Sequence, residues 1–428
     1  MGDVFEPPWP TAPLGRLCSR VSARNTVGET NVLTISAEEG LIRQDDYFKR
    51  VVASSDLSTY SLLAKGDFAY NKSYSNGYPV GAIRRLDRYA TGVVSPLYIC
   101  FRPASREIDP DFLRHYFAAG RVDASIGLLA KEGARNHGLL NVALDDFFGI
   151  PVARPPIWEQ RRIARILDTA DLAIQSKKAL ITKLQQVERG LLHDLMTRGI
   201  NNRGALRDLA KAREFGETPL GRLPKTWAIA RLQDFCEIRS GSTPPRQSSF
   251  IYYSDDGVPW VKTLDLNEGR LVDTEEHVTP LALKHASCPL LSAGTVLVAM
   301  YGGWAQIGRT ALLDTAATTN QAICGLSIRD NTLPLFLLRA LQHGRSRWKA
   351  VAASTRKDPN ITKQDVANFL VPLPSRHEQL VICECFDEHL AVLRRETSEL
   401  QKLLLLQRGL MDDLLTGRVR VSGDEDSV

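Results

Sequence analysis

Residues 185–197, QQVERGLLHDLMT, and residues 404–416, LLLQRGLMDDLLT, are two copies of one pattern, 219 positions apart. The same shift aligns identical residues further upstream without a gap. These upstream pairs are Asn141 with Asn360, Asp146 with Asp365, Val152 with Val371, Pro155 with Pro374, Glu159 with Glu378, Gln160 with Gln379, Ile163 with Ile382 and Asp168 with Asp387. A match of this length indicates an internal duplication.

A second echo occurs at a different distance. The string PLGRL at 13–17 recurs at 219–223, a shift of 206, so we expect the stretches between the repeats to differ in length. The predicted order is a variable block at 1–154, a repeated helix at 155–199, a linker at 200–217, a second variable block at 218–373, a second repeated helix at 374–418 and an acidic tail at 419–428. With 428 residues, the chain is long enough for two domains, each with its own core.

The repeated segments are predicted to be long helices, because their apolar residues recur every three or four positions. In the first copy these residues are Ile163, Leu167, Ala170, Ile174, Ile181, Leu184, Leu191 and Leu195, and in the second they are Ile382, Phe386, Leu393, Leu400, Leu403, Leu410 and Leu414. Pro156 suits a first helical position, and Ser375 with Glu378 forms a potential capping box. Gly199 and Gly417 stand where each helix should end. A helix of about 40 residues is roughly 60 Å long.

A narrow apolar stripe on so long a helix needs a partner, and each copy can serve the other. We therefore expect the helices to pair within the chain as an antiparallel coiled coil with a pseudo-twofold axis. Lys177 and Glu396 then stand near the midpoint, where opposite charges would set the register. The alternative is two independent amphipathic helices, each lying on its own domain.

The fold class predicted for the variable blocks is α+β, because short β-like runs separated by turn signals alternate with amphipathic helical stretches. The β-like runs include GDFAYNKSYSNGYPVGAIRRL, GVVSPLYICFR, GVPWVKTLDL and AGTVLVAMYGG, and the helical stretches include DPDFLRHYFAAG and LPLFLLRALQHG. Residues 65–106 are rich in basic side chains, namely Lys65, Lys72, Arg84, Arg85, Arg88, Arg102 and Arg106. Such a patch suits phosphate contacts, although it is equally typical of a solvated basic surface.

Several classes of protein are disfavoured by composition. No uncharged apolar run approaches the ~20 residues that span a bilayer and the first residues do not resemble a signal peptide, so a cytoplasmic location is expected. The seven cysteines lack paired CxxC spacing, so neither a disulfide framework nor a structural zinc site is expected. Cys383 and Cys385 are interpreted as buried thiols on a helix.

The sequence lacks the common catalytic motifs. There is no Gly-Lys dipeptide and hence no phosphate-binding loop of the GxxxxGK[ST] type; His377 and Glu378 do not extend to HExxH, and no GxSxG is present. Neither a glycine-rich loop fit for a methyl donor nor the Asn/Asp-Pro-Pro-aromatic string of amino-methyltransferases occurs. Asp255, Asp256, Glu275 and Glu276 are interpreted as solvated loop charges. We therefore expect no catalytic residue, metal or cofactor on this chain.

The paired strings EQRRIARILDTADLAI with RGLLHDLMTRGI, and EQLVICECFDEHLAVL with RGLMDDLLTGRV, resemble the specificity subunit of type I restriction-modification systems. The string TPLGRLPKTWAIARL, which opens the second block, adds to the resemblance. One departure is that the second repeated segment is acidic where the first is basic. The resemblance implies that 1–154 and 218–373 are target-recognition domains, each reading one half of a bipartite site in double-stranded DNA, and that the helices space them.

The same resemblance implies partners for phage defence by DNA methylation and cleavage. Two methyltransferase subunits would bring S-adenosylmethionine, and restriction subunits would bring ATP and Mg²⁺. The candidate DNA contacts are Lys72, Arg84, Arg85, Arg246, Lys262, Tyr301 and Arg309. The candidate helix-pair interface is Ile163, Leu167, Ile174, Ile181, Leu184, Leu191, Ile382, Phe386, Leu393, Leu400, Leu403 and Leu410.

Two alternatives remain open at this point. A non-catalytic coiled-coil scaffold predicts no salt-sensitive DNA affinity, and an enzyme with unfamiliar motifs predicts turnover by the isolated chain.

Overall fold

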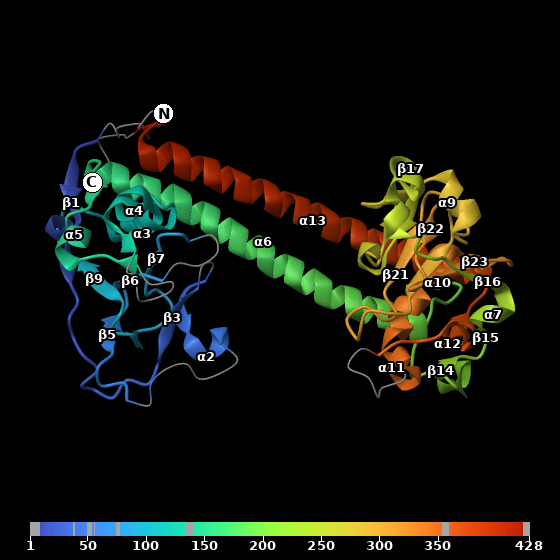
Figure 1. Cartoon of the computed structure of the whole chain (residues 1–428). Coiled ribbons are helices and arrows are strands. Elements are labelled where there is room, and N and C mark those ends of the chain that lie inside the picture. Colours follow the sequence, from blue (N-terminus) through green and yellow to red (C-terminus); the bar gives the residue numbers. More distant parts are fainter. Residues whose placement is uncertain are drawn as a thin grey trace. The chain divides into compact units, whose positions relative to one another are not determined.

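A computed structural model describes residues 9–36, 39–48, 54, 56–73, 78–132, 140–352 and 359–422. The chain divides into two compact units: unit 1 is Met1–Ala179 with Ser398–Val428, and unit 2 is Leu180–Thr397. Both combine helices with sheets (Figure 1), so the predicted α+β class is confirmed. The acidic end of the tail, 423–428, lies outside the described residues.

Unit 1 has a four-stranded sheet in the order β2-β9-β6-β7, with antiparallel neighbours and α3 packed against β7 (Figure 1). Its strands are β1 (Thr11–Pro13), β2 (Cys18–Arg20), β3 (Leu33–Ser36), β4 (Gly40–Arg43), β5 (Ser61–Ala64), β6 (Phe68–Asn71), β7 (Ala82–Arg85), β8 (Thr91–Val94), β9 (Ile99–Pro103), β10 (Lys131–Glu132), β11 (Leu140–Asn141) and β12 (Pro151–Ala153). Its short helices are α1 (Leu14–Leu17), α2 (Gln44–Tyr47), α3 (Pro110–Ala118), α4 (Asp123–Leu129) and α5 (Leu144–Phe148).

Stacked aromatic rings fill the core of unit 1. Phe68 on β6 stacks on Phe101 of β9 with ring centroids 5.4 Å apart, and Tyr70 stacks on Phe147 of α5 at 5.1 Å. All four rings are buried, and pairs of this kind add to the stabilisation from apolar burial. Asp109 begins α3 by accepting hydrogen bonds from the backbone of the first turn, with proline at the first helical position.

Unit 2 has a five-stranded sheet in the order β16-β23-β20-β21-β18 and a smaller sheet, β19-β17-β22. Its strands are β13 (Phe215–Thr218), β14 (Gly221–Pro224), β15 (Ala228–Arg231), β16 (Cys236–Ser240), β17 (Tyr253–Val261), β18 (Arg270–Leu271), β19 (His277–Val278), β20 (Val296–Ala299), β21 (Thr310–Leu313), β22 (Thr318–Thr319), β23 (Ile323–Ile328) and β24 (Leu370–Leu373). Its short helices are η1 (Ala212–Glu214), α7 (Leu232–Phe235), η2 (Arg246–Ser248), α8 (Ser249–Tyr252), η3 (Thr263–Asp265), α9 (Pro280–His285), α10 (Pro334–His343), η4 (Gly344–Arg347), α11 (Trp348–Val351) and α12 (Lys363–Asn368). The central strands β20 (VLVA) and β21 (TALL) are wholly buried, and apart from Thr310 their residues are apolar.

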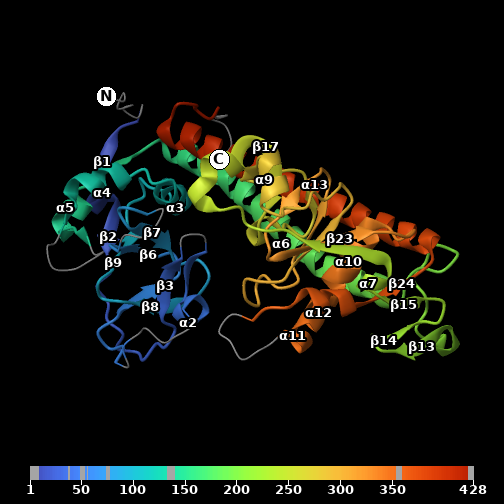
Figure 2. The same cartoon turned by 45° about the vertical axis from the view of Figure 1, so that its right-hand side comes forward.

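Each unit contains a pair of short antiparallel strands, and the two pairs occupy corresponding positions in the sequence. In unit 1, β1 pairs with β12 so that Ala12 faces Val152; in unit 2, β15 pairs with β24 so that Ala230 faces Val371. Figure 2 shows β15 and β24 side by side. The helices that follow, α1 and α7, begin at Leu14 and Leu232. The first strand and helix of each pairing thus correspond at a shift of 218, and β12 and β24 correspond at the shift of 219 found for the repeat.

This finding corrects the interpretation of the PLGRL echo at a shift of 206. The first PLGRL runs from β1 into α1, whereas the second runs through the β13–β14 hairpin. Gly15 is helical, but Gly221 has a φ of +94°, which glycine adopts at no steric cost in a tight turn. One sequence thus serves two local structures, and the echo does not mark equivalent positions.

The two long helices predicted from the repeat are present. They are α6 (Ile157–Thr197) and α13 (Arg376–Thr416), each of 41 residues. Gly199 and Gly417, just beyond them, have positive φ angles of 62° and 72°. Pro156 precedes the first helical residue rather than occupying it, which corrects the predicted start. Ser375 Oγ accepts from Glu378 N at 3.3 Å, but the Glu378 carboxylate binds Arg207 and Ile200 instead of completing a capping box.

Within each unit, one half of α6 packs with the opposite half of α13. In unit 1, Gln407 donates to Asp171, and Lys177 Nζ lies 2.7 Å from Glu399 Oε2. In unit 2, His389 donates to the carbonyl of Leu184 at 3.0 Å. The contact of Lys177 with Glu396 would join the two units, and it stays a prediction.

Among the residues that the structure describes, no helix has both the length and the apolar character needed to cross a membrane.

Candidate nucleic-acid interface

The candidate contacts of unit 1 lie on and beside the β6–β7 pair. Lys72 follows β6, and its carbonyl accepts from Leu140 N at 3.0 Å. Arg84 lies on β7, where its guanidinium donates to Tyr78 Oη at 3.3 Å and stands 5.6 Å from the centroid of that ring. The structure thus brings a cation and an aromatic ring together at the edge strand of the sheet, a combination suited to sugar and base contacts.

A small cavity of about 250 Å³ adjoins Arg84. Tyr70, Tyr78 and Asp123 help to line it, and burial raises the pKa of the Asp123 carboxyl above its ordinary value while nearby Arg84 opposes that rise. The cavity therefore combines a cation, a carboxyl group and aromatic walls at the candidate surface.

Arg85 is held in ion pairs. Its guanidinium binds Asp87 at 2.6 Å and Asp111 at 2.7 Å, and its side chain is only 12% exposed. Two carboxylates already satisfy this cation, so a DNA contact by Arg85 requires those pairs to open. Its assignment to DNA stays a prediction.

In unit 2 the structure brings Arg246 and Lys262 together on one carboxylate. Arg246 Nη1 lies 2.5 Å from Glu276 Oε2, and Lys262 Nζ lies 2.6 Å from Glu276 Oε1. The hydrogen bonds from these two cations lower the pKa of Glu276 to about 2. Glu276 is thus part of the site, which corrects its interpretation as a solvated loop charge.

Aromatic rings support the Arg246 side chain. The guanidinium stands 4.4 Å from the Tyr253 ring centroid and 5.2 Å from that of Trp260. Trp260 Nε1 and Tyr253 Oη donate to the carbonyls of Ser242 and Pro244, which fixes the segment leading to Arg246. The Arg246 side chain nevertheless remains 54% exposed, so its charge is accessible.

Tyr301 and Arg309 lie at opposite ends of the loop between β20 and β21. The Tyr301 side chain is exposed, whereas Arg309 is half-buried and donates to Gln306 at 2.9 Å. Arg345 fixes the loop by donating hydrogen bonds to the backbone carbonyls of Ile307 and Ala305. Only Tyr301 of this pair therefore presents its side chain freely to a ligand.

Sequence reasoning missed several exposed apolar side chains near this loop. Leu264 is 75% exposed and follows Thr263, whose methyl group lies 3.6 Å from the position that a Cβ at Gly302 would take. Trp304, in the same loop, is also exposed. Single exposed apolar residues are common, so exposure alone does not indicate a binding surface. Leu264 and Trp304 are candidates because Leu264 is close to Lys262 in the sequence and Trp304 lies in the loop that carries Tyr301.

The candidate helix-pair residues fall into two classes. Those near helix ends enter the unit cores: Ile163 and Leu167 pack in unit 1, and Ile382 and Phe386 pack in unit 2, all at most 2% exposed. Ile174 is buried as well. The remaining positions are half-buried, namely Ile181, Leu184, Leu191, Leu393, Leu400, Leu403 and Leu410. Their common role as one continuous interface stays a prediction.

Polar residues of the repeat have matching partners in the two units. Gln160 accepts from the backbone N–H of Asp109, which begins α3, and Gln379 accepts from that of Leu333, which begins α10. Glu159 binds Arg420 through both oxygens. Glu378, its counterpart, likewise binds Arg207. These contacts explain why buried polar side chains recur in both copies.

One cluster of metal-ligand types occurs among the described residues: His115, Asp168 and Asp171. Both carboxylates bind the guanidinium of Arg114, with Asp171 at 3.3 Å. The arginine supplies the positive charge that an ion would bring, and the counterpart Asp387 likewise binds an arginine, Arg339, at 3.3 Å. The cluster is therefore an ion-pair network linking α3 to α6.

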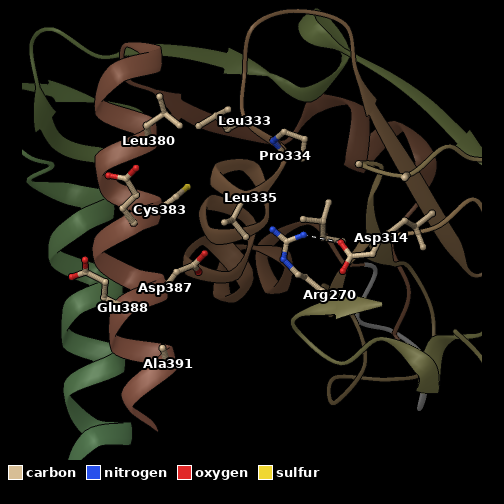
Figure 3. A pocket seen from close by; sticks show the side chains of 15 residues that line it. Arg270, Asp314, Leu333, Pro334, Leu335, Leu380, Cys383, Asp387, Glu388 and Ala391 are labelled. Carbon is tan, nitrogen blue, oxygen red and sulfur yellow. Dashed lines mark hydrogen bonds and ion pairs between the residues drawn. The ribbon is translucent and has the colours of Figure 1, made fainter. Parts of the chain in front are cut away.

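An apolar groove of about 700 Å³ lies on unit 2 between α13, α10 and the β18–β21 edge (Figure 3). Leu333, Pro334 and Leu335 line one side, and Leu380, Cys383 and Asp387 line the α13 side. Glu384 and Glu388 add negative charge to the α13 side, and Arg270 pairs with Asp314 opposite at 2.7 Å. Apolar lining residues with acidic side chains on the α13 side disfavour binding of DNA and favour binding of a protein segment.

Comparison with known proteins shows similarity to one group of proteins. Residues 224–404 match the model of the type I restriction modification DNA specificity domain. The type I restriction enzyme MjaVIII specificity subunit of Methanocaldococcus jannaschii is 23% identical over 302 residues, which cover 68% of this chain and 67% of the relative. The EcoR124I/EcoR124II specificity subunit of Escherichia coli is 21% identical over 35% of this chain and 37% of its own length.

Solved structures agree on the fold. A chain from a study of complex assembly and conformational transition of the type I R-M system matches with a TM-score of 0.59 and 20% identity, covering 97% of this chain and 99% of its own. The type I restriction-modification S subunit from M. genitalium matches with a TM-score of 0.54 and 15% identity, covering 97% and 98%. Both chains therefore share this fold over nearly their full length.

Proposed function

We propose that the chain recognises DNA sequence for a type I restriction-modification complex, because residues 224–404 match the type I DNA specificity domain and the chain is similar to type I specificity subunits. The observation that carries the proposal is the Arg246 surface of unit 2. There Arg246, which lies over the Tyr253 and Trp260 rings, and Lys262 share Glu276, so that two cations and two aromatic faces meet within the matched segment. Such surfaces position phosphates and read base edges.

The finer proposal is that two target-recognition domains, 1–154 and 218–373, each read one half of a bipartite site in double-stranded DNA. The helices would pair along their length as an antiparallel coiled coil with a pseudo-twofold axis and so space the domains. The matching burial of Ile163 with Ile382 and of Leu167 with Phe386 in the cores of the two units supports the equivalence of the two repeats. Two related readers on a symmetric support set the separation of half-sites, as in dimeric DNA-binding proteins.

In this proposal the chain itself is non-catalytic and works in the cytoplasm. Two methyltransferase subunits would bring S-adenosylmethionine, and restriction subunits would bring ATP and Mg²⁺. The apolar groove between α10 and α13 would receive a methyltransferase segment that carries apolar and basic side chains, because Glu384, Asp387 and Glu388 stand on its α13 wall.

A non-catalytic scaffold remains the second candidate, and a specific observation favours it. Arg85, Arg246 and Lys262 are all paired with carboxylates in the free chain, as expected of ordinary surface ion-pair networks. On that account these cations stabilise loops and do not meet phosphate.

The deciding experiment is co-expression of the chain with its neighbouring methyltransferase, followed by single-molecule sequencing of host DNA for methylated adenines. A gapped bipartite motif that requires this chain is the expected result. Unchanged methylation without the chain, together with no complex on co-purification, would overturn the proposal and favour the scaffold.

A matched variant pair tests the partner surface in the same cells. Glu384→Lys with Glu388→Lys should reduce co-purification of the methyltransferase, whereas Glu237→Lys, an exposed change on β16, should not. Equal recovery of the partner with both variants would exclude the groove as its binding site.

A further inference from the structure

Two histidines from different elements meet in unit 2. His193 lies on α6, and His343 is the last residue of α10. Nδ1 of His193 and Nε2 of His343 are 3.3 Å apart, and the rings are tilted by 45° with centroids 5.4 Å apart. Two ring nitrogens therefore converge on one point from separate helices.

The surroundings keep His343 neutral. Burial lowers its pKa to about 4, and the nearby His193 and Arg347 act in the same direction. A neutral imidazole has a free lone pair, so at neutral pH protons do not compete for the nitrogen that would bind a metal. The guanidinium of Arg347 donates to the Leu370 carbonyl at 2.9 Å and lies 4.2 Å from the Phe369 ring centroid, so other groups fix its position.

The separation of the nitrogens matches a specific coordination geometry. Zinc binds imidazole nitrogen at about 2.0–2.1 Å, and a tetrahedral angle then places two such nitrogens about 3.3–3.4 Å apart. Octahedral coordination at similar bond lengths brings neighbouring nitrogens to about 2.9–3.0 Å. The observed 3.3 Å fits the tetrahedral case, and it is longer than a typical hydrogen bond between these atoms.

The cation nearest His343, Arg347, is bound by other groups and does not occupy the ring nitrogens, in contrast to the arginine of the cluster at His115. There Arg114 occupies the carboxylates that an ion would use. At His193 and His343, both nitrogens face each other with no described side chain between them, and His193 is exposed. Water can therefore complete the coordination from the solvent side.

We propose that His193 and His343 form a binding site for a tetrahedral divalent transition-metal ion such as Zn²⁺. The two imidazoles supply two ligands, and water supplies the others. Bound metal would fasten α6 to the end of α10, which packs on the sheet of unit 2 through β21. This site is independent of the proposed DNA function.

The test uses the full chain, purified without a histidine tag and stripped of metal. Titration with Zn²⁺ by calorimetry should show saturable binding of one ion with micromolar affinity, and Co²⁺ should give the strong visible absorption of a tetrahedral complex. His193→Ala and His343→Gln should each weaken binding about tenfold or more. His285→Ala, which removes an exposed histidine at the end of α9 in the same unit, is the matched control and should bind like the parent.

His193→Ala keeps the proposal falsifiable if His343→Gln does not fold, because His193 lies on the exposed face of a helix. Unaltered binding by His193→Ala, sulfur ligands in the X-ray absorption spectrum of the Zn²⁺ form, or no saturable binding by the parent would each overturn the site. In that case the two rings share only a hydrogen bond.

Discussion

At the scale of single residues, Glu276 decides how much positive charge unit 2 offers. It is the common partner of Arg246 and Lys262, and with a pKa of about 2 it remains ionised throughout the neutral range. A phosphate must compete with this carboxylate for both cations. Glu276 holds the two cations in place, and on the proposed function it would also limit non-specific binding of anions.

Replacing the Glu276 carboxylate should remove its competition with phosphate for Arg246 and Lys262. Glu276→Gln keeps the shape of the side chain but removes its charge, so we expect affinity for non-specific duplex DNA to rise by about threefold to tenfold, with a steeper salt dependence. Because the pKa is depressed to about 2, the carboxylate stays charged well below its ordinary value of 4.5, so the difference between variant and parent should be the same at pH 4.5 and pH 8.

Fluorescence anisotropy with a labelled duplex at two salt concentrations measures this change. Glu217→Gln, an exposed charge on β13, is the control for net charge. A rise in affinity no greater than that of the control would show that Arg246 and Lys262 do not contact DNA.

The sequence identified Arg246 and Lys262 as candidates but could not identify the residue that joins them. Glu276 is 14 positions from Lys262 and 30 from Arg246, and the strands β17 and β19 bring it between them. The pairing of β17 with β19 decides whether Glu275 or Glu276 points toward Arg246 and Lys262. Glu275 remains 84% exposed, and no feature of the dipeptide distinguishes the two in advance.

At the scale of elements, the long helices act as anchors for the short helices that cover each sheet. Gln379 on α13 accepts from Leu333 N at 2.9 Å and donates to the Pro374 carbonyl at 3.0 Å. It is buried, and so is its counterpart Gln160, which performs the same task for α3. A buried amide that satisfies the start of a second helix fixes where that helix meets the first.

Removal of this amide should destabilise unit 2. Gln379→Ala leaves the Leu333 N–H without its acceptor, so we expect a loss of about 1–3 kcal/mol in the free energy of unfolding. Denaturant titration followed by circular dichroism measures the change, and Gln401→Ala on the exposed face of the same helix is the control. Equal stability of the two variants would contradict the anchoring role.

Elements were the part of the structure most accessible to sequence reasoning. The apolar spacing and terminal glycines located α6 and α13, because a helix of 41 residues carries many repeats of its period. The β1–β12 and β15–β24 pairs were not predicted. The strands β1 and β12, for example, are three residues each and join distant parts of the chain. The PLGRL echo pointed to the wrong counterpart for the same reason: local strings do not report long-range pairing.

At the scale of the whole molecule, the account is that one chain carries two DNA readers. The relatives share the fold over nearly the full length of the chain, and each unit holds its own core together with halves of both long helices. On the proposed function, duplication would let two divergent blocks read unlike half-sites, as the two halves of a dimeric DNA-binding protein read like ones. Each block should then determine one half of the target independently.

The most direct test of this claim is to exchange residues 218–373 for the corresponding block of another type I specificity subunit. The exchanged chain and the parent are each co-expressed with the methyltransferase, and methylated adenines are mapped by single-molecule sequencing. The account predicts a gapped motif in which one half changes and the other half stays the same, with the reciprocal result when residues 1–154 are exchanged. If both halves change together, or if neither changes, then the chain does not read DNA as two separate modules.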